Sequence, residues 1–238
     1  MMLQLPTPLP VPQLEKLIRL QLDFICNVVK AYDSEGSAVG FGCNVMRYVD
    51  AAGPGFAAQQ ASLQARTKCI ETGVAISNLA GVLDLQLPLS IHSTSSSQPD
   101  ANLVALALPV PRNLANGTVD ITKVLPGAPY AFAARKELVF GNLAELIDEA
   151  ERNRGFSSTV VNELKEVFRA QQNSIQALIC IPLYPPPVQP SVAGMAPIGV
   201  LNIHRNTHDQ HTSGKFEHLS PLLAPLVENL GNLVARLP

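Results

Sequence analysis

Apolar residues recur at helical spacing near both ends of the chain. Spacings of three, four and seven residues predict an amphipathic helix over residues 12–31, with Pro12 in the first turn, where proline is tolerated. A similar pattern predicts a long helix from about Phe216 to the end of the chain, kinked at Pro225. The apolar stripe of the first helix consists of Leu14, Leu17, Ile18, Ile25, Val28 and Val29.

Three shorter segments also favour helix. Residues 56–71 contain strong helix formers and no proline. Asn142 precedes an apolar helical pattern and Glu145 stands three residues later, which makes an asparagine version of the capping box. Either Ser157 or Ser158 can cap the helix that follows, because both precede another run with helical spacing.

Short apolar runs bounded by turn residues predict strands between these helices. Asn116-Gly117 is a hairpin signal, so we expect 101–112 and 118–125 to pair as antiparallel strands. Residues 136–142 form another short strand, and residues 41–50 are ambiguous. Two further apolar runs face each other across the Pro-rich connector 184–197. Strands joined by hairpins and grouped with helices indicate an α+β domain with one antiparallel sheet.

Composition narrows the classes of function. Of the 238 residues, 47% are hydrophobic and 15% are charged, which is typical of a globular protein. A net charge of −2 with scattered Lys and Arg gives no sign of binding to nucleic acid or to a membrane. Residues 1–11 form a Pro-rich arm without the features of a leader peptide, and no apolar run is long enough to span a membrane. We therefore expect a cytoplasmic protein.

The C-terminal half resembles a GAF domain. In that family a strand ending in Pro-Leu leads through a hairpin to a Gly-Val-Leu strand, and a long helix closes the domain. The corresponding pieces are Pro182-Leu183 in "SIQALICIPLY", Gly199-Val200-Leu201 in "IGVLNIHRN", and the helix "FEHLSPLLAPLVENL". Upstream, "ELVFGNLAELIDEAERNRGF" is similar to the segment that caps the ligand pocket, with Asn142 where relatives often carry Asp.

The resemblance covers about residues 100–236 and, loosely, the first helix. It implies one GAF-like domain over residues 12–238, in which residues 35–99 are divergent or elaborated. The implied fold is α+β, with a central antiparallel sheet flanked by helices on both faces and the N- and C-terminal helices packed together. It also implies a homodimer through those terminal helices, and a small-molecule pocket on the other face of the sheet.

The resemblance also points to ligand-binding candidates. Arg152 and Arg154 would lie over the pocket mouth and receive an anionic ligand, although Asp148 and Glu151 beside them are equally typical of a solvated helix face. Asn202 and His204 would form the pocket floor. The full set of candidates is Phe140, Asn142, Arg152, Arg154, Phe156, Asn202 and His204. The motif of the cyclic-nucleotide GAF domains is absent, and the sequence identifies no cofactor.

Two other kinds of site are less well supported. His208 and His211, with His204 and Asp209 nearby, are more typical of a polar loop than of a metal site, so no metal is expected. Four dispersed cysteines form neither a metal motif nor a disulfide framework. Cys26 and Cys180 lie in apolar segments and are predicted to be core residues.

Three functions follow from this pattern. The first is a non-enzymatic sensory or regulatory module of signal transduction that binds a small molecule and acts through dimerisation or a partner protein. The second is a protein-interaction module with a vestigial pocket, in which the Pro-rich stretches or the polar loop 93–100 contact the partner. The third is a thiol enzyme resembling free methionine sulfoxide reductase, in which Cys43 or Cys69 is the reactive thiol. No catalytic residue is assigned.

Overall fold

The computed structural model describes residues 9–33, 39–93, 98–113, 115–153, 155–171, 173–186, 195–208 and 212–238. Its helices are α1 (Val11–Asp33), α2 (Phe56–Arg66), α3 (Ala128–Ala134), α4 (Leu143–Asp148), α5 (Ser158–Ala170) and α6 (Thr212–Val234). Its strands are β1 (Phe41–Asp50), β2 (Leu79–His92), β3 (Ala107–Pro111), β4 (Leu138–Phe140), β5 (Ala177–Leu183) and β6 (Gly199–Arg205). Two 3₁₀ turns, η1 (Ile76–Asn78) and η2 (Ile121–Lys123), and a π-helical turn, η3 (Glu149–Asn153), complete the described secondary structure.

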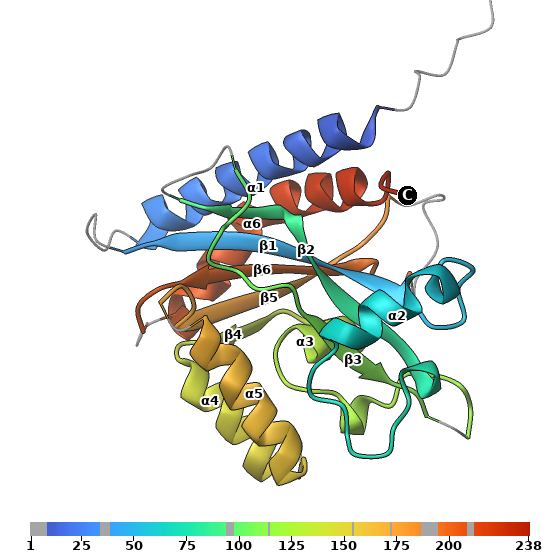
Figure 1. Ribbon diagram of the computed structural model, residues 1–238. Coiled ribbons are helices and arrows are strands. Elements are labelled where there is room, and N and C mark those ends of the chain that lie inside the picture. Colours follow the sequence, from blue (N-terminus) through green and yellow to red (C-terminus); the bar gives the residue numbers. More distant parts are fainter. Residues whose placement is uncertain are drawn as a thin grey trace, which may run out of the picture.

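One six-stranded sheet organises the molecule (Figure 1). The strand order is β3-β2-β1-β6-β5-β4, and every neighbouring pair is antiparallel. β1 and β6 occupy the centre, and β2 is interrupted by a bulge beside Pro88, where the missing N–H costs no ladder bond. The predicted α+β class with a central antiparallel sheet is confirmed, and the arrangement is consistent with a GAF-like fold.

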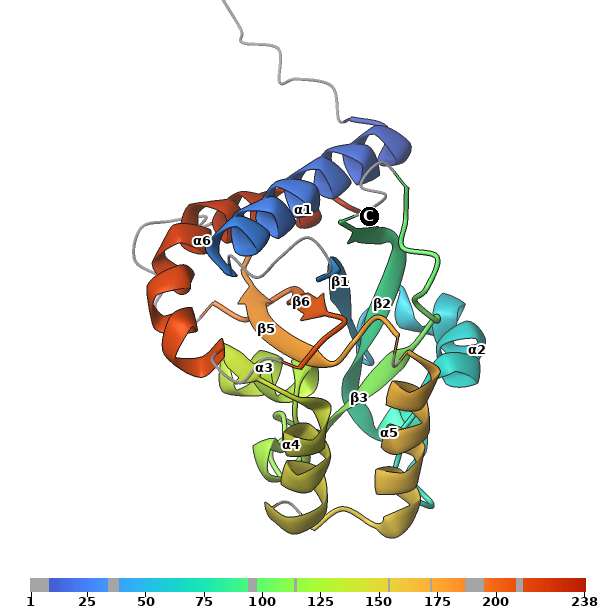
Figure 2. The same ribbon diagram turned by 90° about the vertical axis from the view of Figure 1, so that its left-hand side faces the viewer.

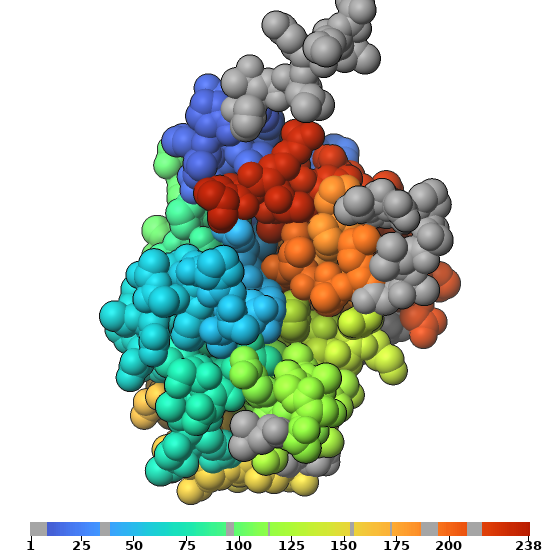
Figure 3. Space-filling model, turned by 90° about the vertical axis from the view of Figure 1, so that its right-hand side faces the viewer, coloured from blue at the N-terminus to red at the C-terminus, as the bar shows by residue number. Residues whose placement is uncertain are grey.

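Helices cover both faces of the sheet (Figure 2). α1 and α6 pack together on one face, where Ile18, Ile25 and Leu223 join Val45 and Leu201 of the sheet in a buried cluster. α3, α4 and α5 cover the other face. Figure 3 shows the α1 and α6 segments side by side at one end of the molecular surface. None of the described helices has the length and apolarity that a membrane span requires.

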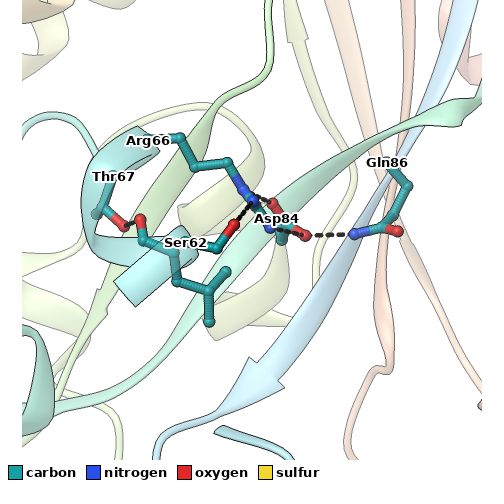
Figure 4. Close-up of polar contacts among 6 residues, drawn as sticks. Ser62, Arg66, Thr67, Asp84 and Gln86 are labelled. Atoms are coloured by element: carbon teal, nitrogen blue, oxygen red, sulfur yellow. Dashed lines mark hydrogen bonds and ion pairs between the residues drawn. The ribbon is translucent and has the colours of Figure 1, made fainter. Parts of the chain in front are cut away.

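Two ion pairs, one buried and one partly buried, tie helices to the sheet. Arg205 Nη1 on β6 lies 2.9 Å from Asp33 Oδ2 at the end of α1, and both side chains are almost fully buried. On α2, the guanidinium of Arg66 binds both carboxylate oxygens of Asp84 on β2, at 2.7 and 2.9 Å (Figure 4). Gln86 donates to the same carboxylate. Because unpaired buried charges are costly, these contacts fix where α1 and α2 lie on the sheet.

The predicted hairpin of 101–112 with 118–125 is wrong. Only residues 107–111 form a strand, and that strand pairs with β2. The turn itself forms, with Gly117 at a φ of +73°, but it carries a single bridge between Arg112 and Val119. Past the turn, the Asp120 side chain caps η2 by accepting from the Thr122 N–H at 3.2 Å. Such local side-chain bonds compete with a β ladder, which explains why no second strand forms there.

The other predicted elements are confirmed, with small changes of boundary. Asn142 caps α4 by accepting from the Glu145 N–H at 3.0 Å, and Ser157 rather than Ser158 caps α5. α2 ends at Arg66 instead of Glu71. Pro221 and Pro225 lie inside α6, whose axis changes direction along its length (Figure 2). The ambiguous residues 41–50 form β1, and β2 lies in the segment that the resemblance left unexplained.

Candidate functional site

A small cavity lies between the sheet and the α3–α5 layer. Its volume is about 60 Å³, several times the ~10–15 Å³ that a single water molecule requires. The walls are mainly apolar and come from strands β1, β2, β3, β5 and β6, the segments before β3 and α3, and helices α3 to α5. Among the lining residues are Met46, Leu85, Leu103, Leu125, Leu146, Leu164, Phe168 and Leu178. Three lining residues carry side-chain amides, namely Asn44, Gln171 and Asn202.

Asn44 and Asn202 form an amide pair across the centre of the sheet. They are directly opposite in the β1–β6 register, and Asn202 Nδ2 donates to Asn44 Oδ1 at 3.0 Å. Both residues are buried, and Asn202 Oδ1 has no hydrogen-bond partner within the described residues. Turning both amides over would move the free oxygen to Asn44 without removing it. The pair therefore presents one unsatisfied acceptor at the cavity.

Gln171 supplies a second unsatisfied amide oxygen from the opposite wall. It follows α5 directly, and its backbone carbonyl accepts from the N–H groups of Ser174 and Ile175, both at 2.9 Å. These bonds fold the chain back over the cavity. The side-chain Nε2 makes a long contact of 3.4 Å to the Val167 carbonyl. Gln171 Oε1 is buried and has no partner in the part of the chain that the structure describes.

His204 lies two residues from Asn202 on the same face of β6. Its ring occupies the space beside Gly42, its partner on β1, and a side chain on Gly42 would collide with that ring. Nδ1 lies 3.1 Å from the carbonyl oxygen of Ser174, whereas Nε2 is buried and has no partner among the described residues. Glycine at position 42 is therefore what allows a buried imidazole at this point of the sheet.

The protonation of His204 follows from its surroundings. Burial lowers the pKa of His204, against smaller opposing effects from the Ser174 carbonyl and the charge of Asp100. The ring is therefore neutral at pH 7. Since a carbonyl only accepts hydrogen bonds, Nδ1 carries the proton and donates it to Ser174. Nε2 is left with a free lone pair and acts as an acceptor.

Asp100 lies close to this group on the segment that leads to β3. Its N–H donates to Ser90 Oγ at 3.0 Å, and Ser90 is the register partner of Asn44. One carboxylate oxygen, Oδ1, accepts from the backbone and side-chain N–H groups of Asn102 at 2.9 and 3.0 Å. The other, Oδ2, is buried and unpaired within the described chain. Asp100 does not line the cavity, although its charge acts on His204.

A surface groove adjoins the cavity. Its volume is about 220 Å³, and it shares Leu106, Val167 and Gln171 with the cavity wall. Glu163, Glu166 and Lys68 line its outer part. Glu163 also accepts from the Cys69 N–H at 2.5 Å, which ties α5 to the segment after α2. The shared residues place this groove next to the cavity.

The structure brings together only part of the predicted site. Asn202 lines the cavity and His204 lies next to it. Phe140 and Phe156 pack at the edge of the same apolar cluster but do not line the cavity, and Asn142 is used as the α4 cap. Three-quarters of the Arg152 side chain is exposed (74%), and it pairs with Asp148 at 3.6 Å outside the cavity lining. Arg154 lies outside the described residues.

Sequence reasoning missed Asn44, Asp100 and Gln171. Asn44 carried a usable signal, because it is a lone amide among the apolar positions of "FGCNVM". Asp100 and Gln171 carried none, since polar residues beside loops are ordinarily solvated. Among the described residues, no three His, Cys, Asp or Glu side chains converge as metal ligands. The predicted polar-loop residues Asp209 and His211 lie outside the described part of the chain.

All four cysteines are buried free thiols. Cys26 on α1 and Cys43 on β1 place their sulfur atoms 3.0 Å apart inside the α1–α6 layer. Burial raises the pKa of Cys43 well above its usual value, and Cys26 adds to the effect. Burial and the charge of Glu163 raise the pKa of Cys69 to about 12, and burial also raises the pKa of Cys180. These surroundings disfavour thiolate formation.

Comparison with known proteins adds little to this geometry. No family model matches the sequence, and no curated protein matches it. Among solved structures, the chain is similar to the type II free methionine-R-sulfoxide reductase from Thermoplasma acidophilum. The two are 13% identical with a TM-score of 0.34, over 91% of this chain and 96% of that chain. A likeness this distant assigns neither a family nor an activity.

Proposed function

We propose that this protein is a GAF-like sensory or regulatory module that binds a small molecule without transforming it. The binding site is the cavity between the sheet and the α3–α5 layer, entered through the groove beside Gln171. Apolar walls with a few fixed polar groups are the usual composition of a small-molecule site. The position of the cavity, on the face opposite the paired terminal helices, is also where the GAF resemblance implies a pocket.

The observation that carries this proposal is the pair of free amide oxygens at the cavity. Asn202 Oδ1 and Gln171 Oε1 are both buried and unpaired in the described chain. Leaving a buried polar group unsatisfied costs about 1–3 kcal/mol, so such groups are normally paired. Both residues line the cavity, so a molecule bound there would lie beside these amides.

The response to the ligand would pass through the terminal helices. On α1, Leu17, Leu20 and Phe24 are exposed although they are large and apolar, and Leu222 on α6 is exposed as well. We propose that this strip is the interface of a homodimer, since contiguous exposed apolar residues mark association sites. The variant Phe24→Lys should shift the molar mass measured by light scattering from dimer to monomer. Gln59→Lys, at an exposed polar position of α2, is the control and should leave the molar mass unchanged.

The thiol-enzyme alternative has weaker support. A reactive cysteine requires an accessible site that favours the thiolate. Here the four thiols are buried, and burial raises the pKa of Cys43, Cys69 and Cys180. The interaction-module alternative relies on the Pro-rich stretches and on the loop 93–100, large parts of which lie outside the described residues.

Native mass spectrometry tests the proposed function. Protein purified under mild conditions should carry a bound mass that organic solvent removes. The variant Ala128→Leu fills space at the cavity wall and should lose that mass, whereas Ala133→Leu, on the same helix but outside the lining, should keep it. Two results together would refute the proposal. The wild-type protein would carry no extra mass, and no small molecule in a screen would stabilise it more than it stabilises Ala128→Leu.

A further inference from the structure

We propose that the ligand of the cavity is an uncharged molecule with a mainly hydrocarbon surface, smaller than benzene. This inference rests on the proposed function and specifies the chemical class and the size of its ligand. It differs from the sequence-based expectation of an anionic ligand held by Arg152 and Arg154. The lining of the cavity, its entrance and its volume all support it.

The lining of the cavity carries no charge. Among the described residues, no Asp, Glu, Lys, Arg or His lines the cavity. Apart from the amides of Asn44, Gln171 and Asn202, every lining residue is apolar or glycine. An ion that moved between such walls would lose its hydration and gain no counter-charge, which is strongly unfavourable. The site therefore discriminates against anions and cations alike.

The entrance to the cavity is apolar as well. Most of the lining residues are buried, and those that remain partly exposed are Leu106, Leu108, Val167 and Phe168. The charged side chains of the adjoining groove, Lys68, Glu163 and Glu166, do not belong to the cavity lining. A hydrocarbon surface is favourably removed from water on this route, whereas an ion would be dehydrated before it met any opposite charge.

The volume of the cavity limits the size of the ligand. At about 60 Å³, the cavity is well below the ~300–1,000 Å³ that is usual for the sites of larger ligands. It is also less than half of the ~150 Å³ of an apolar cavity that holds benzene. Because benzene has six heavy atoms, we expect a ligand of about five heavy atoms or fewer. Short amides, ketones and alcohols belong to this class.

A set of probes with the same shape and different charge tests the inference. At pH 7 propionamide is neutral, propionate is an anion and propionamidinium is a cation. The readout is the NMR signal of isotope-labelled methionine methyl groups, because Met46 lines the cavity and Met195 lies outside it. Propionamide should shift the Met46 signal saturably, with a dissociation constant roughly tenfold or more below those of both ions. The Met195 signal is the internal control and should not move.

A pair of variants on α3 locates the binding. Ala128→Leu fills space at the cavity wall and should abolish the propionamide shift at Met46, whereas Ala133→Leu, outside the lining, should keep it. The comparison of the three probes uses the wild-type protein, so it holds even if Ala128→Leu does not fold. A shift that persists unchanged in folded Ala128→Leu would overturn the cavity as the binding site.

The outcomes separate the class of ligand from the proposed function. Binding of either ion as tightly as propionamide would overturn the uncharged class and leave the small-molecule function standing. A retained mass of several hundred daltons in the native mass measurement would overturn the size limit in the same way. If no probe moves the Met46 signal, the inference fails, and the mass measurement with Ala128→Leu decides the function separately.

Discussion

The side chain of Asn202 donates a hydrogen bond to Asn44 at 3.0 Å across the two central strands of the sheet. Both amides are buried and both residues line the cavity, and Asn202 Oδ1 has no partner within the described residues. Apolar residues at these two positions would pack a sheet core without any unsatisfied group. Under the function proposed above, this pair contributes to ligand binding and lowers stability.

Substitution of this pair should be strongly non-additive. Asn202→Leu leaves the Asn44 amide without a partner, and we expect it to cost about 1–3 kcal/mol in the free energy of unfolding. The double variant Asn44→Leu/Asn202→Leu removes both groups and should be more stable than the single variant. Urea unfolding measures both. If the costs of the substitutions at Asn44 and Asn202 simply add in the double variant, the two amides do not act as a pair.

Acid should destabilise the protein through His204. Burial lowers the pKa of His204 in the folded state below its usual value of 6.5, so the unfolded chain binds the proton more readily. Stability linked to this group is complete above about pH 6.5 and falls as the pH drops below that value. Asp100 and His92 face the ring and act in opposite directions, with Asp100 favouring and His92 disfavouring the charged form.

The variant His204→Gln checks this effect, since glutamine keeps a donor for the Ser174 carbonyl. Its free energy of unfolding should depend less on pH between 5 and about 6.5 than that of wild type. His218→Gln, at an exposed position of α6, should leave the wild-type slope unchanged. The same slope in wild type and His204→Gln would mean that His204 is not the titrating group.

The buried ion pair Asp33–Arg205 and the exposed pair Asp148–Arg152 should differ greatly in their effect on stability. Asp33→Asn removes the buried carboxylate that lies 2.9 Å from the guanidinium of Arg205 and should cost about 3–5 kcal/mol. Asp148→Asn breaks the exposed pair with Arg152 and should cost about 0–1 kcal/mol. Chemical denaturation compares the two directly. Similar costs would contradict the assignment of Asp33–Arg205 as the contact that fixes α1 on the sheet.

The four thiols should react slowly in the native protein. Because they are buried, an aromatic disulfide reagent should label them only as fast as the protein opens, and all four should react at once in denaturant. The variants Cys43→Ala and Cys69→Ala should keep any stabilisation by ligand. Rapid labelling of one cysteine in the folded protein, together with loss of function on its substitution, would instead favour the thiol enzyme.

The sequence predicted the elements whose apolar pattern is decided locally. The terminal helices carry a long one-sided stripe, and the caps at Asn142 and Ser157 depend on residues three positions apart. β1 and β2 gave a weak signal because they are buried on both faces, so their apolar residues do not alternate cleanly with polar ones. The turn at Gly117 was predicted correctly, yet its strand pairing depended on β2, which the local pattern did not reveal.

The candidate site was predictable only where it lies on a recognisable strand. Asn202 and His204 stand on β6 within the motif that carries the family resemblance. Gln171 lines the cavity because α5 packs against the sheet, and Asp100 is held by Ser90 on β2. The local sequence pattern encodes neither placement. Arg152 is the opposite case. It is close in sequence to the segment expected to cap the pocket, yet its side chain is exposed to solvent.

A crystal structure of the protein as purified from its source tests the central claim most directly. We predict electron density in the cavity for a molecule larger than water, with donor atoms within hydrogen-bond distance of Asn202 Oδ1 and Gln171 Oε1. A cavity closed by its own side chains, with both oxygens paired within the chain, would contradict the claim.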